Sequence, residues 1–339
     1  NYRTAFGGYY KREYKTTSKT DTLIQQKVIT KSVFPVVAQQ YASKIEGSEV
    51  QSSARSHIGV GGFFSWGDKF SIRGSISGGY YTKHGELNDT EAILPNTYFY
   101  NGANNNRWEI DPKIRASYTP NKFFNFQAGI DQHFIGEGAR SILQSDIAAS
   151  SPFFQIKSSL WKLQFLNLYQ FLREKEQDQI IPKFTASHML NIQITERFQF
   201  GIFESVIFMP KDENWRRGFE IDYLNPFLFY RPQSYSIGSQ DALVIGTNLS
   251  YNFDNIMIYG QFLIDEFVLN ELRERSRWWA NKYAGQIGIK GKYKSKRKLL
   301  QYRTELNFAR PFTYSHVNSS TTYGHQGLPL THPQGAHFV

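Results

Sequence analysis

The side chains best suited to chemistry in this 339-residue chain are aromatic and basic residues grouped late in the sequence. Arg277 directly precedes Trp278 and Trp279, and Lys282 and Tyr283 follow within four residues. Sugar C–H faces pack on aromatic rings, and a cationic side chain binds a carboxylate. The group is therefore a candidate contact for an acidic glycan. Aromatic residues at the start of a strand also fit a purely structural role, so both interpretations stay open.

A second candidate is the glycine-rich segment between residues 136 and 146. Glycines permit positive φ and close backbone approach, and Arg140 and Asp146 carry opposite charges. This pair either holds the segment folded inward or contacts a sugar acid. The residues expected to build an inward-folded plug are Gly136, Glu137, Gly138, Ser141 and Asp146. Arg140 and the more distant Arg231 are added to the candidate glycan contacts.

Histidines gather towards the C-terminal end, at His316, His325, His332 and His337. Imidazole is a common metal ligand. No pair of these histidines has a short ligand spacing with a carboxylate nearby, so we expect neither a metal site nor a cofactor. The chain also has no cysteine, which excludes thiolate catalysis and cysteine-based metal sites.

Catalytic signatures are missing from the sequence. It contains no G-x-S-x-G elbow, no H-E-x-x-H, no phosphate-binding G-x-x-x-x-G-K-[ST] and no dinucleotide fingerprint. We therefore expect a protein that is not an enzyme. One alternative is a membrane lipase with a lipid-facing serine and histidine, for which His188, on the apolar face of its predicted strand, is the candidate.

The formal net charge of +10 makes acidic partners plausible, whether nucleic acid, anionic lipid or acidic polysaccharide. A basic run could neutralise phosphates of lipid headgroups or lipopolysaccharide, or could be a plain basic turn. Its members are Lys292, Lys294, Lys296, Arg297 and Lys298. Nucleic acid is not expected as a partner, because the alternation described next explains the aromatic residues without stacked bases.

The elements that must position these residues are predicted by a strict alternation of apolar and polar side chains. Trp108, Ile110 and Ile114 alternate with Glu109 and Arg115, as expected for a strand between lipid and a polar lumen. The clearest runs are Arg107–Tyr118, Phe124–Phe134, Phe184–Thr195 and Leu243–Phe253. Aromatic residues near their ends suit the girdles of a membrane barrel.

Further runs have the roughly 9–11 residues that a tilted spanning strand needs, about twice the strand length typical of a soluble β-sandwich. They are Tyr2–Tyr14, Ile58–Phe64, Phe70–Tyr80, Trp161–Phe171, Ile256–Ile264, Tyr283–Tyr293 and Tyr302–Phe312. Every apolar run is too short for a membrane helix. We predict an all-β, antiparallel transmembrane β-barrel of about 14–18 strands when complete. Pro112 removes a ladder donor, so a bulge or break is expected there.

The connections fall into two kinds, as in outer-membrane barrels. Thr119–Lys122 and Asp254–Asn255 predict short periplasmic turns. The long segments are expected to be extracellular loops: Glu86–Asn106, Gly136–Pro152, Pro210–Gln240 and Asp265–Asn281. Within the last of them, Glu266–Arg277 has the spacing of a short amphipathic helix.

No repeat or linker marks a second domain, so residues 1–339 are predicted to be one barrel domain. From Pro311 onwards there is no Asp, Glu, Lys or Arg, and no alternating strand that could close a barrel. We therefore expect the chain to be truncated at its C-terminus.

Several segments resemble a known family. The stretch from His133 to Asp146, with the amphipathic strand after Trp161, resembles the glycine-rich element of Wzi-like capsule-assembly outer-membrane barrels. Other segments look like the variant of that family found with gliding-motility and surface-secretion machinery. They are Tyr223–Phe227, Tyr230–Pro232, Tyr259–Phe262, Asp265–Phe267, Trp278–Tyr283, Arg310–Tyr314 and His332-Pro333.

The resemblance implies a barrel of the bacterial outer membrane with surface-exposed loops, without catalytic residues or cofactor. Such a barrel would bind or organise surface or capsular polysaccharide. The alternative is a structural subunit of a gliding-motility or secretion assembly, and a solute porin is third. The partners implied are outer-membrane lipid and lipopolysaccharide, acidic surface polysaccharide, and other outer-membrane proteins.

Overall fold

The computed structural model describes most of the chain. The described residues are 29–46, 49–84, 99–103, 106–176, 179–210, 221–224, 241–265, 274, 281–295, 298–316 and 321–331. The expected strand at Tyr2–Tyr14 lies outside them, as does nearly all of the expected helix at Glu266–Arg277. Among the described residues, no helix has the length and apolar character needed to cross a membrane.

Nearly all regular structure is β. The strands are β1 (Ile29–Glu46), β2 (Glu49–Trp66), β3 (Phe70–His84), β4 (Phe99–Ala103), β5 (Asn106–Tyr118), β6 (Phe124–Asp131), β7 (Ser151–Leu160), β8 (Leu163–Glu176), β9 (Gln179–Gln193), β10 (Phe198–Phe208), β11 (Ala242–Asn252), β12 (Ile256–Ile264), β13 (Tyr283–Ser295), β14 (Lys298–Ala309), β15 (Gly324–His325) and β16 (Leu328–Pro329). One 3-10 turn, η1 (Ile221–Leu224), lies between β10 and β11.

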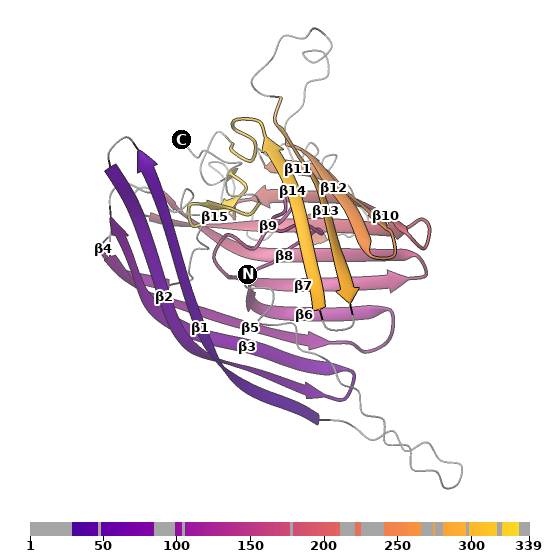
Figure 1. Ribbon diagram of the computed structural model, residues 1–339, viewed down its shortest axis with the longest axis horizontal. Helices are drawn as coiled ribbons and strands as arrows, with labels where there is room; N and C mark the ends of the chain where they lie inside the picture. Colours follow the sequence, from indigo (N-terminus) through magenta and orange to yellow (C-terminus); the bar gives the residue numbers. More distant parts are fainter. Residues whose placement is uncertain are drawn as a thin grey trace.

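Fourteen strands form one antiparallel sheet that follows the order of the sequence from β1 to β14, with β4 paired beside β5. The sheet curls round on itself, with β1 and β14 both crossing the front of the view (Figure 1). Short turns join the strands at one end, including the predicted turns before β6 and before β12. The long connections lie at the other end. This is the antiparallel barrel architecture that the alternation predicts.

The two faces of the sheet differ as expected from the sequence. Apolar side chains on the outer face are exposed, with Val33 80%, Ile58 73% and Trp108 67% accessible. The inner face carries polar side chains such as Arg55 and Glu109, which are almost fully buried. Exposed apolar stripes of this length are costly in water and favourable in lipid. The outer face is therefore suited to a hydrocarbon environment.

Pro112 interrupts the ladder on one side only. On the β3 side, the pairing runs without a break from Phe70↔Tyr118 to Thr82↔Asn106 and includes Ile76↔Pro112. On the other side, β4 pairs with residues 106–110 and β6 with residues 114–118. The proline thus lies where β5 changes partner, so a missing N–H donor coincides with a gap in the pairing. The expected break is real, but β5 itself continues through it.

Two pieces of the described chain occupy part of the interior. We name residues 132–150, between β6 and β7, the plug loop, and the described residues 311–316 and 321–331 the C-terminal segment. Their apolar side chains pack against inward-facing residues of the wall such as Phe203 and Leu263. The core members from these pieces are Ile135, Ile142, Leu143, Ile147, Ala148, Tyr314, Tyr323, Leu328 and Leu330. The barrel therefore has a small apolar core of its own inside the lumen.

Candidate functional site: the lumen beneath the plug

The plug loop turns inward at Gly136, whose φ is +134°. A Cβ there would lie 2.1 Å from the Gln261 side-chain nitrogen, so only glycine fits. The side-chain oxygen of the same glutamine accepts a 3.0 Å hydrogen bond from the Ile142 N–H, and the Ser141 hydroxyl accepts one of 3.0 Å from the Leu143 N–H. The Ser141 hydroxyl also donates to Gln261 at 3.0 Å, so Gly136 and Ser141, two of the plug candidates, both lie against this wall residue.

A carboxylate of the wall holds the tip of the plug loop. Glu305 on β14 accepts hydrogen bonds from the Ala139 N–H at 2.7 Å and from the Tyr259 hydroxyl at 2.8 Å. On β13, Gln286 donates to the Arg140 carbonyl at 2.8 Å, and the Lys290 ammonium lies 2.5 Å from the Glu137 carboxylate. Backbone groups that leave the sheet are thus satisfied by side chains, as buried polar groups require.

The expected pair of Arg140 and Asp146 is long. Their charged atoms are 3.9 Å apart, and the side chains are 34% and 25% exposed. An exposed pair of this length contributes little to stability. The loop is held instead by Gln261, Gln286 and Glu305, which the sequence did not single out.

The C-terminal segment also holds the plug loop in place through hydrogen bonds. The Tyr314 hydroxyl donates to the Ile142 carbonyl at 2.9 Å, and the Tyr323 hydroxyl donates to Gln144 at 3.0 Å. Burial raises the pKa of both phenols above the ordinary value, so both stay protonated donors at neutral pH. Ser145 adds a backbone hydrogen bond to Leu330 at 2.6 Å.

Below the plug loop lies a cavity of about 740 Å³, lined by side chains of β2 to β11. Amides and cations dominate its walls. The lining residues are Phe63, Ser71, Arg73, Arg115, Ser117, Gln127, Gln132, His133, Phe134, Ile135, Gly136, Glu137, Gln155, Lys157, Gln164, Leu166, Met189, Asn191, Gln199 and Asn248. A volume of this size holds a ligand of several rings, and amides with cations are donors suited to hydroxyl and carboxylate groups.

The cations of the cavity are only partly neutralised. Arg115 donates to Asp131 at 2.7 Å, and Arg73 lies 3.5 Å from the same carboxylate with 47% of its side chain exposed. The Lys157 ammonium has no hydrogen-bond or ion-pair partner among the described residues. One carboxylate thus faces two guanidinium groups, and a lysine stands free beside them. An anionic ligand would find uncompensated charge here.

His133 lines the cavity as a neutral group. Its ring meets the Phe153 ring edge-on, with 4.3 Å between centroids. Burial first, and then the charges of Arg115 and Arg73, lower its pKa well below the usual range. The cavity therefore gains no positive charge from His133 at neutral pH.

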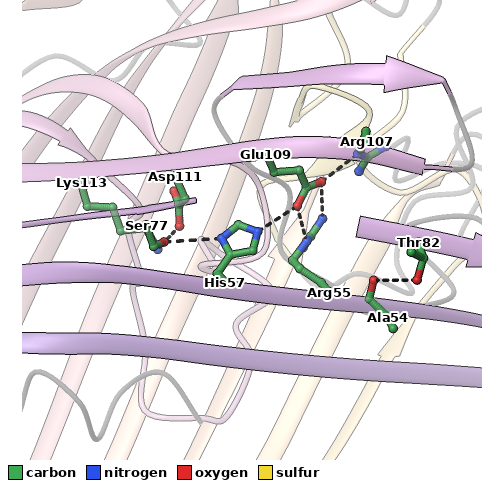
Figure 2. Close-up of polar contacts among 9 residues, drawn as sticks. All are labelled: Ala54, Arg55, His57, Ser77, Thr82, Arg107, Glu109, Asp111 and Lys113. Carbon is green, nitrogen blue, oxygen red and sulfur yellow. Dashed lines mark hydrogen bonds and ion pairs between the residues drawn. The ribbon is translucent and has the colours of Figure 1, made fainter. Parts of the chain in front are cut away.

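A second polar cluster lies on the inner wall, on β2, β3 and β5 (Figure 2). The carboxylate of Glu109 is 2.6 Å from Arg55 Nε, 2.7 Å from Arg107 Nε and 3.2 Å from His57 Nε2. The other imidazole nitrogen of His57 is 3.5 Å from the Ser77 hydroxyl. A line of hydroxyl, imidazole and carboxylate is able to activate a serine. Here guanidinium groups also bind both carboxylate oxygens. The arrangement therefore fits a structural contact that holds the strands together.

The outer wall carries one buried polar row. His188 pairs in register with Asn167 on β8 and with Glu204 on β10, and its ring lies 5.6 Å from that of Phe165. All three polar residues are at most 7% exposed. His188 lies on the outer, otherwise apolar face, as the alternation predicts. Neither of its register partners is the serine that the lipase alternative requires, so the register adds no support to that alternative.

The other predicted contacts are placed as follows. Tyr283 begins β13 and lies among outer aromatic rings, 6.2 Å from Phe262 and 6.3 Å from Phe308, which fits the girdle interpretation. Trp278, Trp279 and Arg231 lie outside the described residues. In the part of the chain that the structure describes, no three His, Asp or Glu side chains are grouped to hold a metal ion.

No protein-family model matches the chain, and a search of curated proteins finds no match either. Solved structures do match. One is Wzi of Escherichia coli, described as an outer membrane protein involved in group 1 capsule assembly and as a carbohydrate-binding β-barrel. It is 12% identical with a TM-score of 0.52, over 91% of this chain and 64% of Wzi. The fold is that of an outer-membrane β-barrel.

Two further matches are an anion-selective porin from Comamonas acidovorans and the outer membrane channel DcaP of Acinetobacter baumannii. The porin is 10% identical with a TM-score of 0.38, over 88% of this barrel and 94% of the porin. DcaP is 10% identical with a TM-score of 0.36, over 83% and 91%. Both are too distant to describe the fold further. The barrel described here spans 64% of the length of Wzi, so the likeness concerns the fold alone.

Proposed function

We propose that this protein is a plugged barrel of the bacterial outer membrane that binds acidic surface polysaccharide in its lumen. The observation that carries the proposal is the cavity beneath the plug loop, which is lined by Arg73, Arg115 and Lys157. Asp131 pairs with both arginines, and the carboxylate of Glu137, which also lines the cavity, pairs with Lys290 on β13. Hydroxyl-rich, negatively charged chains match such a lining, because amides pair with hydroxyl groups and guanidinium groups pair with carboxylates.

Two further features support a polymeric ligand. The cavity of about 740 Å³ is larger than a single sugar needs. Phe63 and Phe134 add ring faces to the amide lining, which suits the C–H faces of sugars. The net charge of +10 would draw an anionic polymer towards the protein.

The direct test is titration of the purified full-length protein in detergent with hexagalacturonate, a linear acidic hexasaccharide, at low salt. We expect binding that weakens as salt rises and no binding of the neutral maltohexaose. Replacing Arg73 and Lys157 together by Gln removes two charge-assisted contacts, so affinity should fall at least about tenfold. Lys162→Gln, in the turn between β7 and β8, is the control. Equal binding of both sugars, or no binding to the native protein, would overturn the proposal.

The assembly-subunit alternative rests on the segments that look like the gliding-motility variant, around Arg231, Trp278 and His332; these three residues lie outside the described ones. It remains a second proposal. Purification of the native protein from membranes in mild detergent, followed by mass spectrometry, tests it. Stoichiometric outer-membrane partners would establish it, and a lone barrel carrying polysaccharide would count against it.

A further inference from the structure

A column of cations faces the lumen on β13 and β14. Side chains alternate along β13, and Gln286 and Lys290 point inward because both contact the plug loop. Lys292 and Lys294 therefore point inward as well, at successive spacings of about 7 Å along the strand. On β14, Arg303 is the register partner of Lys290. We name Lys290, Lys292, Lys294 and Arg303 the basic column.

Most of this charge has no partner. Lys292, Lys294 and Arg303 are exposed, and none of these side chains has a hydrogen bond or ion pair among the described residues. The carboxylate on the same face of β14 as Arg303, that of Glu305, already accepts hydrogen bonds from the plug loop, Tyr259 and Asn307. Inward-facing residues of the adjacent β12, Met257 and Tyr259, carry no negative charge. Three of the four cations of the basic column, Lys292, Lys294 and Arg303, are thus unneutralised by the described residues.

One anion does reach the column, and it comes from the plug loop. The Glu137 carboxylate lies 2.5 Å from the Lys290 ammonium, which also donates to the Glu137 carbonyl at 3.0 Å. The Glu137 and Lys290 side chains are 30% and 27% exposed, so water screens the pair and its contribution is small. Glu137 also lines the cavity. It therefore stands where the cavity and the basic column meet.

We propose that the basic column is a second anion subsite for a linear polyanion, and that Glu137 occupies its inner end while the ligand is absent. The inference rests on the proposed function, because it extends the same lumen site. A polyanion that spans the cavity and the column makes several charge contacts at once, and these outcompete one exposed carboxylate. Binding then separates Glu137 from Lys290, which removes one of the contacts that hold the plug loop to the wall.

The test compares four forms of the full-length protein titrated with hexagalacturonate at several salt concentrations. Glu137→Gln removes the internal competitor, so affinity should rise about two- to fivefold. Replacing Lys292 and Lys294 together by Gln should lower affinity at least about tenfold and flatten the dependence on salt. Lys298→Gln is the matched control. Lys298 lies on the same hairpin, but the alternation along β14 places it on the outer face.

The outcomes separate the inference from the function it rests on. Tight binding by the native protein, with unchanged affinity in Glu137→Gln and in the Lys292 and Lys294 variant, would overturn the inference and leave the cavity proposal standing. Loss of binding only in the Arg73 and Lys157 variant would do the same. A native protein that binds no acidic hexasaccharide, together with a Glu137→Gln variant that also binds none, would overturn both.

Discussion

The Glu109 side chain is a buried negative charge on the inner face of the barrel wall, and its neighbours neutralise it. It is 1% exposed and is matched by two guanidinium groups, Arg55 and Arg107, which also stack on the Tyr81 ring at 5.3 and 4.3 Å. The sequence predicted that the odd positions of β5 share a polar face. It could not predict that Glu109 meets Arg55 and His57 on β2, because that depends on the register between strands.

Removing this carboxylate should be costly. Glu109→Ala leaves two buried guanidinium groups without their counter-charge, and such losses cost about 3–5 kcal/mol. We expect a clearly lower unfolding midpoint in detergent, measured by tryptophan fluorescence during denaturant titration. Glu196→Ala, in an exposed turn, should leave the midpoint unchanged. Equal midpoints for both variants would show that the Glu109 cluster does not stabilise the wall.

His325 gives the lumen a pH dependence. It lies in β15, and its Nδ1 accepts a 3.0 Å hydrogen bond from the Arg173 N–H. Burial is the main cause that lowers the His325 pKa to about 4. A hydrogen bond with the Arg173 backbone opposes this shift, and the positive charges of Lys183 and Arg173 add to it. The unfolded chain takes up this proton near pH 6.5, so it binds more protons than the folded protein between pH 6.5 and 4.

Stability from His325 is therefore complete above pH 6.5 and is lost as the pH falls towards 4. The full loss is about 3 kcal/mol. His133, whose pKa is also lowered, acts in the same direction. We expect His325→Gln to flatten the pH dependence of the denaturation midpoint in this window, and His84→Gln, at an exposed position, to leave it unchanged. An unaltered slope in His325→Gln would contradict a buried, neutral His325.

At the scale of elements, local alternation predicted much of the sheet. The run Ile256–Ile264 coincides with β12, and Thr119–Lys122 is the expected turn. Four strands of the main sheet, β1, β4, β7 and β10, have no counterpart among the predicted runs, and β4 (Phe99–Ala103) lies within the predicted loop Glu86–Asn106. In β1 the outward apolar residues Val33, Val37 and Tyr41 recur every four positions, with Pro35 and Gln39 between them, so a period-two search passes over it. The extended conformation of β1 is stabilised by its pairing with β2 along its whole length, which a search for local alternation does not detect.

The plug loop was predicted from glycine and charge, but its anchors were not. Gln261, Gln286 and Glu305 lie on strands more than 100 residues away, and nothing local marks them as loop contacts. The C-terminal segment carried no alternating pattern, and its place in the lumen depends on tyrosines that meet the plug loop. The position of the plug loop and of the C-terminal segment therefore depends on strand register and packing, which local periodicity does not encode.

A change at the turn of the plug loop should open the lumen. Gly136→Ala places a methyl group 2.1 Å from the Gln261 nitrogen and strains a φ of +134°. We expect a higher single-channel conductance in planar bilayers than for the native protein, because the loop must move away from the wall. Gly78→Ala, whose nearest contact would be an ordinary 3.6 Å, is the control. Equal conductance of all three proteins would show that the plug tolerates the methyl group.

For the whole molecule, the outer apolar face separates a membrane barrel from a soluble β-protein. Val60 is 49% exposed on the outer face of β2, whereas Ser75 on β3 faces the lumen. In lipid, Val60→Arg should cost about 2–4 kcal/mol of folding free energy, and Ser75→Arg much less. Folding into lipid vesicles, followed by denaturant titration, measures the difference. Equal tolerance of both substitutions would contradict lipid exposure of this face.

A lipid-facing wall surrounds a basic, amide-lined lumen closed by the plug loop, and we propose that this lumen binds an acidic glycan. The most direct measurement is an experimental structure of the full-length protein with hexagalacturonate. We predict density for the sugar beneath the plug loop, with its carboxylates at Arg73 and Lys157. An empty cavity in protein that binds the sugar elsewhere would contradict the proposal.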